Sequence, residues 1–198
     1  MDEKVREIQT RLRKTMSTTL LLDDSMQKIP IVGFEEVSVK PPGTERFVLE
    51  VITELKERGY RVAAVKRLNI NTASEQVNTL ALPYMEAGSD AALLSLPNRM
   101  ITVRKTESEP SLKEMVEALG EDFDVIIGES FGYYAVPKFL ITKRPQEGFN
   151  LGLPNIIGYV SERDANATIP WFKTTDISAV AEKIERDIIG KHKADYSI

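Results

Sequence analysis

The sequence contains no cysteine and only one histidine among its 198 residues. The lack of cysteine excludes disulfide bonds, thiolate catalysis, and zinc or iron–sulfur sites held by thiolates, although it does not identify the compartment. The histidine, His192, lies in a polar C-terminal tail, 191–198, that we expect to be disordered. Because nothing would hold its imidazole in place, a Ser-His-Asp site is not expected. We assign no catalytic residue, while Ser-Lys and two-carboxylate sites stay open.

Long apolar runs and basic patches are also missing. No apolar run approaches the ~18 residues of a membrane span. The first residues, MDEKVREIQTRLRK, are charged and lack a signal-peptide core, so we expect a cytoplasmic protein. The net charge is −4, and no basic stripe with interleaved aromatic residues is present, so nucleic acid and membrane are not expected partners. The Asp23-Asp24 pair is interpreted as a solvated turn, and no metal site is predicted.

What is present is organised around the segment from Lys28 to Tyr60, which predicts a buried strand, a loop and an amphipathic helix. The strand covers Ile29 to Phe34. The helix begins near Thr44 and places apolar residues on one face at a spacing of 3.6, namely Phe47, Val48, Val51, Ile52 and Leu55. This order is the frame of a nucleotide-binding P-loop, whose backbone amides wrap phosphates at a helix N-terminus.

The loop of this segment, 35–43, lacks the glycines and the lysine of that motif. The consensus is Gly-x-x-x-x-Gly-Lys-Ser/Thr. After Gly33 the next glycine is Gly43, which comes far too late for the motif. Gly43 is followed by Thr44-Glu45 in place of Lys-Ser/Thr. We therefore expect the loop to connect strand and helix without forming a phosphate cradle, while the helix N-terminus at Thr44 could keep a weak anion site.

The charges of the loop oppose phosphate binding as well. Pro41 and Pro42 have no amide hydrogen to donate, and Lys40 is the only cation of the loop. Three carboxylates lie close by in the sequence, those of Glu35, Glu36 and Glu45. Each would repel a polyanion by roughly 1 kcal/mol. We predict that GTP and ATP bind no more tightly than about millimolar, near −4 kcal/mol.

Charged residues follow two further predicted strands at their carboxyl ends, where open parallel sheets bind their ligands. Lys66 and Arg67 follow the strand Val62 to Val65, and Glu129 follows the strand Phe123 to Gly128. Two interpretations of the basic pair stay open, an anion site and two solvated cations. Glu129 either helps hold Mg²⁺, as acids after such strands do in P-loop proteins, or accepts a hydrogen bond from a nearby loop.

Alternating strand and helix patterns predict an α/β fold with a mostly parallel sheet and helices on both faces. Residues 1–27 are expected to form an extra N-terminal helix and a linker, and residues 28–190 a single domain. The remaining predicted strands are 91–96, 100–103, 137–143 and 155–160, and the remaining predicted helices are 80–87, 108–119 and 177–189. The short piece that contains Trp171 and Phe172 is expected to be extended and part of the core.

From about Ile29 to Ile189, the order of features resembles the MobB family, adaptor proteins of molybdopterin-guanine dinucleotide biosynthesis. The resemblance is carried by IPIVGF with FVLEVITELKERGYRVAAVK, and by MEAGSDAALLS, FDVIIGESF and PKFLITK. FDVIIGESF is similar to a family strand that ends in Val-Glu-Gly-Phe, which places Glu129 and Phe131. PKFLITK resembles the Pro-Lys strand that follows it, which places Lys138. Two motifs depart from the family: Gly-Lys-Thr is replaced by Gly43-Thr44-Glu45, and a histidine-rich stretch by Lys66-Arg67-Leu68-Asn69.

The resemblance implies a P-loop-NTPase-like three-layer fold, a homodimer, and a molybdenum-cofactor nucleotide transferase or an apo-molybdoenzyme as partner. It also implies GTP and Mg²⁺ as cofactors, with little hydrolysis of GTP. The degenerate loop lacks the residues that would bind them. We therefore expect no enzymatic activity beyond that of a weak GTPase. The candidate cofactor-binding residues are Gly33, Lys40, Gly43, Thr44, Lys66, Arg67, Glu129 and Lys138.

Three functions stay open at this point. The first is an adaptor in molybdenum or tungsten cofactor maturation that works by protein contacts. The second is a GTP-binding protein whose phosphates are held by Lys40, Arg46 and Lys66 in place of the usual lysine. The third is a P-loop-derived protein with an unrelated, non-enzymatic binding role. An apolar stripe in the first helix, formed by Val5, Ile8 and Leu12, needs cover and adds to the expectation of a dimer.

Overall fold

The computed structural model describes residues 28–37, 44–68, 80–132, 134–143, 152–163 and 168–195. The predicted N-terminal helix and linker, together with Lys40 and Gly43, lie outside these residues. Two compact units are present. The sheet unit contains the described residues up to Arg67 and from Val116 onward, and the hairpin unit is Leu68–Met115.

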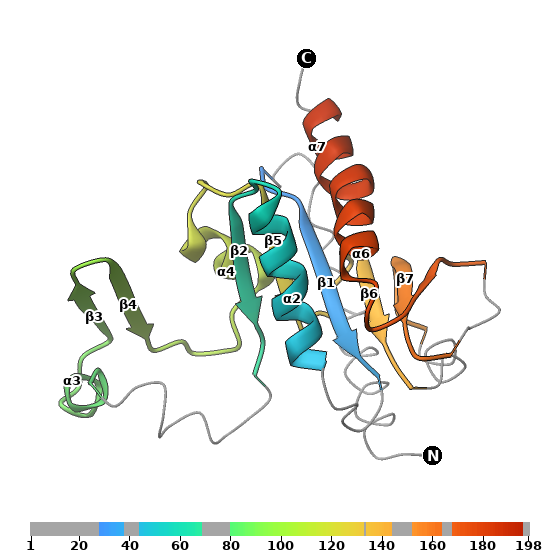
Figure 1. Ribbon diagram of the computed structural model, residues 1–198. Coiled ribbons are helices and arrows are strands. Elements are labelled where there is room, and N and C mark those ends of the chain that lie inside the picture. Colours follow the sequence, from blue (N-terminus) through green and yellow to red (C-terminus); the bar gives the residue numbers. More distant parts are fainter. Residues whose placement is uncertain are drawn as a thin grey trace. The chain divides into compact units, whose positions relative to one another are not determined.

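The sheet unit is built on six strands in the order β2-β5-β1-β6-β7-β8 (Figure 1). Every neighbouring pair of these strands is parallel, and β1 lies inside the sheet between β5 and β6. The predicted α/β architecture with a mostly parallel sheet is confirmed. The strands are β1 (Ile31–Glu36), β2 (Val62–Lys66), β5 (Val125–Glu129), β6 (Lys138–Ile141), β7 (Ile156–Val160) and β8 (Trp171–Phe172).

One face of the sheet is covered by α2 (Thr44–Glu57) and α6 (Ile177–Ile184), which contact each other. The apolar stripe predicted for α2 is buried except for Ile52, which is half-buried, and it packs against the strand residues that face it. Phe34 and Phe139 stack in this layer with their ring centroids 5.3 Å apart. Helix α2 is followed by Gly59, whose φ of 90° glycine adopts without strain. The amide of Tyr60 closes the last turn by donating to the carbonyl oxygen of Leu55 at 3.1 Å.

The opposite face carries a second apolar cluster, made of Val37, Leu140, Leu153 and Tyr159. Leu140 follows Phe139 along β6, so the strand alternates its side chains between the two layers. Trp171 packs against this second cluster and Phe172 against the first. The indole Nε1 of Trp171 donates to the carbonyl oxygen of Ser161 at 3.0 Å. The prediction that both aromatic residues of this extended piece contribute to the core is confirmed.

The C-terminal helical segment runs further than the sequence predicts. After α6 come a π-helical turn, η2 (Glu185–Ile189), and α7 (Gly190–Asp195). The prediction of a disordered tail over 191–198 is therefore wrong for residues 191–195. Gly190 stays in the right-handed helical region, with φ −65° and ψ −42°, so it continues the helix where a left-handed glycine would have ended it.

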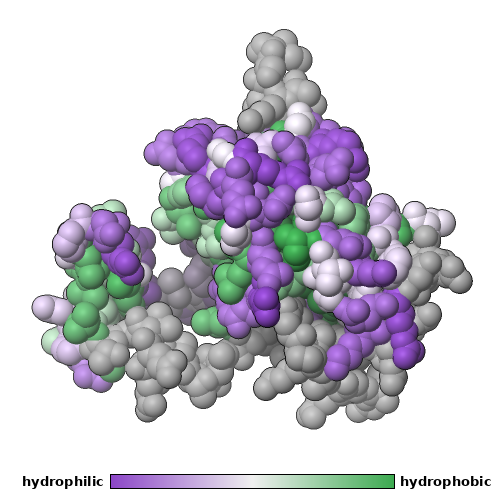
Figure 2. Space-filling model, viewed as in Figure 1, coloured by the Kyte–Doolittle hydropathy of each residue, from purple (hydrophilic) through white to green (hydrophobic). Residues whose placement is uncertain are grey.

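The hairpin unit contains the short helix α3 (Leu82–Glu86) and the antiparallel strands β3 (Ala91–Leu96) and β4 (Arg99–Arg104). The two strands predicted at 91–96 and 100–103 are confirmed, and they pair as a hairpin. Helix α4 (Leu112–Leu119) begins in this unit and ends in the sheet unit. Large apolar side chains are exposed on the hairpin unit, and Figure 2 shows its hydrophobic surface. They are Leu68, Leu80, Leu82, Tyr84, Leu93, Leu96, Met100 and Ile101.

Candidate functional site

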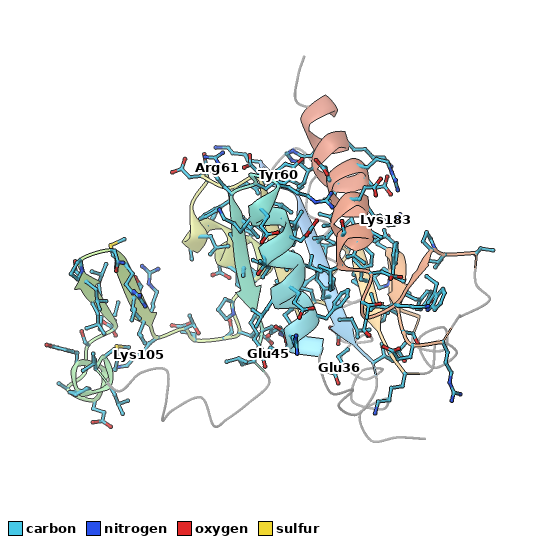
Figure 3. The ribbon with its side chains drawn as sticks, in the orientation of Figure 1. Glu36, Glu45, Tyr60, Arg61, Lys105 and Lys183 are labelled. Atoms are coloured by element: carbon cyan, nitrogen blue, oxygen red, sulfur yellow. The ribbon has the colours of Figure 1, made fainter. Side chains whose placement is uncertain are left out.

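The carboxyl ends of three neighbouring strands, β2, β5 and β1, meet at one edge of the sheet. The register aligns Phe34 of β1 with Glu129 of β5, and Glu129 with Lys66 of β2. Helix α2 begins at Thr44 and carries Glu45 in its first turn. Figure 3 shows Glu45 at the same end of the sheet unit as Glu36, which closes β1. Since open parallel sheets bind ligands at this edge, it is the candidate functional site.

Lys66 connects the helix and the sheet at this edge. Its ammonium nitrogen, Nζ, donates to Oε1 of Glu45 at 2.9 Å and lies 3.1 Å from Oε1 of Glu129. The hydrogen bond that Lys66 donates to Glu45 raises the pKa of Lys66, and Glu129 raises it further against the effect of partial burial. Lys66 therefore keeps its positive charge and shares it between two carboxylates from different elements. We call these three residues the edge cluster.

The edge cluster is open to solvent. The side chains of Lys66 and Glu45 are 42% and 70% exposed, whereas that of Glu129 is 22% exposed. Because solvent screens such pairs, each contributes only about 0.2–1 kcal/mol to stability. Two carboxylates and one ammonium leave the cluster with a net charge of −1. The edge of the sheet, where an anion would be expected, is thus negative at its centre.

The other face of the same strands is arranged differently. Gly33 aligns with Gly128 on one side and with Lys138 on the other, one residue before the row that contains Glu129. A Cβ atom on Gly128 would lie 2.5 Å from the ring of Phe131, and one on Gly33 would lie 3.1 Å from its Cβ. The two glycines therefore make room for Phe131, which the chain after β5 folds back onto this face.

Lys138 is fully buried on this second face. Its ammonium nitrogen donates to the carbonyl oxygens of Tyr134 at 2.6 Å and Pro154 at 2.9 Å. Burial lowers the pKa of Lys138 to about 8, and the negative charge of Glu35 opposes that shift. Glu35 itself accepts a hydrogen bond from the amide of Gly132 at 2.8 Å. Lys138 thus joins two loops across the face opposite to the edge cluster.

The predicted site residues therefore divide between the two faces. Lys66 and Glu129 come together beside the start of α2, where Thr44 is the first residue. The backbone amide of Arg67 donates to the carbonyl oxygen of Glu129 at 3.1 Å and extends the pairing of β2 with β5. Gly33 and Lys138 lie on the opposite face. These contacts do not test whether the residues share one cofactor site, so the shared site stays a prediction.

One residue of the edge cluster was not among the predicted site residues. From the sequence alone, Glu45 was predicted only to repel anions, but in the structure it is a partner of Lys66. A signal was available, because Glu45 lies in the first turn of a helix that follows β1, and Lys66 follows a strand of the same sheet. Pairing them requires knowing that β5, which is remote in sequence, lies between β1 and β2.

Within the described ranges, no three side chains of the types His, Cys, Asp and Glu gather closely enough to hold a metal ion. Over the same part of the chain, no helix is both long enough and apolar enough to cross a bilayer.

Comparison with solved structures relates the fold to known proteins. A crystal structure of molybdopterin-guanine biosynthesis protein B is 22% identical, with a TM-score of 0.65 over 79% of this chain and 98% of that chain. MobB from Bacillus subtilis is 17% identical, with a TM-score of 0.63 over 81% and 98%. A MobB homologue from Bacillus stearothermophilus is 12% identical, with a TM-score of 0.62 over 81% and 98%. The predicted P-loop-NTPase-like fold is confirmed.

The sequence itself carries a family match. Residues 32–162 match MobB, described as molybdopterin guanine dinucleotide synthesis protein B. No curated protein matches the chain. The matched residues begin in β1, end just after β7 and include the whole edge cluster. Because they make up more than half of the chain, this protein belongs to the MobB family.

Proposed function

We propose that this chain is an adaptor in the biosynthesis of the guanine dinucleotide form of the molybdenum or tungsten cofactor, and that it acts through protein contacts with GTP binding weak or lost. Membership of the MobB family supports the pathway. The observation that carries the loss of GTP binding is the edge cluster, in which the positive charge of Lys66 is already shared between Glu45 and Glu129.

The expected cofactors, GTP and Mg²⁺, fit these residues poorly. A P-loop NTPase holds the β- and γ-phosphates with its lysine, and holds Mg²⁺ with the following Ser/Thr and with an acid after a strand. In this chain Gly43-Thr44-Glu45 replaces Gly-Lys-Ser/Thr. Glu45 therefore brings a negative charge to the position of a neutral hydroxyl. A triphosphate would meet a net charge of −1 at the edge cluster, and each nearby carboxylate would oppose it by roughly 1 kcal/mol.

Titration calorimetry with GTP and Mg²⁺ tests this part of the proposal. We expect no dissociation constant below about 1 mM, which corresponds to about −4 kcal/mol. A micromolar constant would favour the second candidate function, in which Lys66 releases its carboxylates and contacts phosphate. That candidate rests on the place of Lys66 beside the first turn of α2. Arg46, the other described cation proposed for it, is paired with Glu50 at 2.7 Å.

The hairpin unit supports the protein-contact part of the proposal, including a homodimer. A two-stranded hairpin is marginally stable alone in water. Here apolar side chains are exposed on both of its faces: Leu93, which pairs with Thr102, on one face, and Ile101, which pairs with the half-buried Leu94, on the other. Exposed apolar patches of this kind mark protein-binding surfaces. The partners that this surface would accept are a second copy of the chain and a nucleotide transferase or apo-molybdoenzyme.

Two matched substitutions test the role of the hairpin unit. Leu93 on β3 and Leu49 on α2 are almost equally exposed, at 58% and 57%. We expect Leu93→Glu to convert a dimer to a monomer in sedimentation velocity at micromolar concentration, and Leu49→Glu to leave the dimer intact. A monomeric unsubstituted chain would contradict the dimer. A pull-down then distinguishes the adaptor function from an unrelated binding role. The adaptor function predicts that the unsubstituted chain captures a molybdenum-cofactor nucleotide transferase and that the Leu93→Glu variant does not.

A further inference from the structure

The ammonium group of Lys66 occupies an unusual position in a fold of this class. In P-loop NTPases, Mg²⁺ is held between the Ser/Thr that ends the motif and an acid at the end of a neighbouring strand. By motif position, Glu45 stands at the Ser/Thr and Glu129 at the acid. Nζ of Lys66 lies 2.9 Å and 3.1 Å from one oxygen of each. The ammonium is therefore bound by the two residues that would correspond to the ligands of the metal ion.

We propose that Lys66 is an internal cation that replaces a divalent metal ion at this edge, and that Glu45 and Glu129 form a divalent-cation site once its ammonium group is removed. The proposal deepens the proposed loss of GTP binding. Its test uses metal ions without nucleotide, so either proposal can fail without the other.

The distances allow such a site. Because both carboxylate oxygens contact the same nitrogen, they are at most 6.0 Å apart, the sum of 2.9 Å and 3.1 Å. Calcium binds oxygens at about 2.3–2.6 Å, so two oxygens on one ion are at most about 5 Å apart. The side chain of Glu45 is 70% exposed and can rotate to close this difference. Magnesium keeps several water ligands and is usually bound by one or two carboxylates together with substrate phosphates, so this pair supplies the protein ligands of such a site.

The charges explain why the native chain would exclude the ion. With Lys66 the edge cluster carries −1, and without it −2. The ammonium is tethered to β2, so it competes with any free ion at a high effective concentration. Helix α2 is thus joined to β2 and β5 without a bound metal ion.

The experiment measures Mn²⁺ binding at pH 7.5 by electron paramagnetic resonance, with the full chain and no nucleotide. For Lys66→Met we expect binding at least tenfold tighter than for the unsubstituted chain. Lys66→Arg keeps a positive charge and should bind no better than the unsubstituted chain. The double variant Lys66→Met/Glu129→Gln should lose the gain. Lys66 is 42% exposed on an edge strand, so these variants are expected to fold, and circular dichroism checks that they do.

A matched control removes a lysine from an ion pair elsewhere. Lys183 lies 2.7 Å from Asp187, which keeps its contact with Arg186 when the lysine is lost. Lys183→Met should therefore not increase Mn²⁺ binding. Equal affinity of Lys66→Met and the unsubstituted chain would overturn the proposal, as would a gain that survives Glu129→Gln. Mn²⁺ binding by the unsubstituted chain that Glu129→Gln abolishes would also overturn it, because the metal would then displace Lys66.

Discussion

Replacing the buried Lys138 with methionine tests whether its hydrogen bonds stabilise the fold by more than the burial of its charge destabilises it. Methionine has a similar length but cannot donate to the carbonyl oxygens of Tyr134 and Pro154. Each lost hydrogen bond from a charged group costs about 1.5–3 kcal/mol. The substitution also removes the cost of burying the charge, about 3 kcal/mol for a pKa lowered from 10.5 to about 8. At pH 7.5 we therefore expect Lys138→Met to lower the free energy of unfolding by about 1–2 kcal/mol.

The pH dependence of that difference identifies the lysine as its source. The pKa of Lys138 is lower in the folded protein than in the unfolded chain, so the unfolded chain binds more protons between pH 8 and 10.5. Stability of the unsubstituted protein therefore gains from raising the pH through this range. Between pH 7.5 and 9.5 the gain is about 2 kcal/mol. Lys138→Met lacks this contribution, so the two unfolding free energies should diverge by that amount.

Urea denaturation followed by circular dichroism at pH 7.5, 8.5 and 9.5 measures both quantities. Lys56→Met, which removes an exposed lysine from the last turn of α2, is the control and should show no comparable divergence. A difference between Lys138→Met and the unsubstituted protein that stays constant with pH would refute the reasoning. It would mean that the ammonium–carbonyl contacts offset the burial of the charge, leaving the pKa of Lys138 near 10.5.

Three further substitutions follow from single contacts, each measured by urea denaturation. Gly128→Ala should cost about 1–3 kcal/mol, because its Cβ would overlap the ring of Phe131 at 2.5 Å, and Phe131→Leu in the same chain should recover part of this loss. Tyr60→Phe removes a 2.6 Å hydrogen bond to Glu185. That bond raises the pKa of Tyr60 to about 12, so the stability lost in Tyr60→Phe should be greatest below pH 10 and should shrink toward pH 12. An equal loss of stability at pH 11 and below pH 10 would contradict this. Ser111→Ala should cost about 1 kcal/mol by removing an N-terminal helix cap, and Ser111→Asp should cost less.

Local patterns in the sequence were enough to determine most of the secondary structure and the class of fold. Apolar residues spaced by 3.6 along α2 and the apolar run from Ile31 to Phe34 in β1 depend only on neighbours in the chain. The replacement of Gly-Lys-Ser/Thr by Gly43-Thr44-Glu45 is likewise visible without a structure. The helical end, 190–195, was missed because Gly190 is compatible with both a stop and a continuation, and the buried Ile188 and Ile189 just before it favour continuation.

The grouping of the charged residues was decided only by the tertiary structure. Lys66 and Glu129 are 63 positions apart, and they meet because β5 is inserted beside β2. Lys138 and Lys66 both lie on strands of one sheet, yet the alternation of side chains sends them to opposite faces. One lysine is therefore exposed between two carboxylates and the other buried against two carbonyl oxygens. Strand order and register set this difference, and both depend on contacts between residues far apart in the sequence.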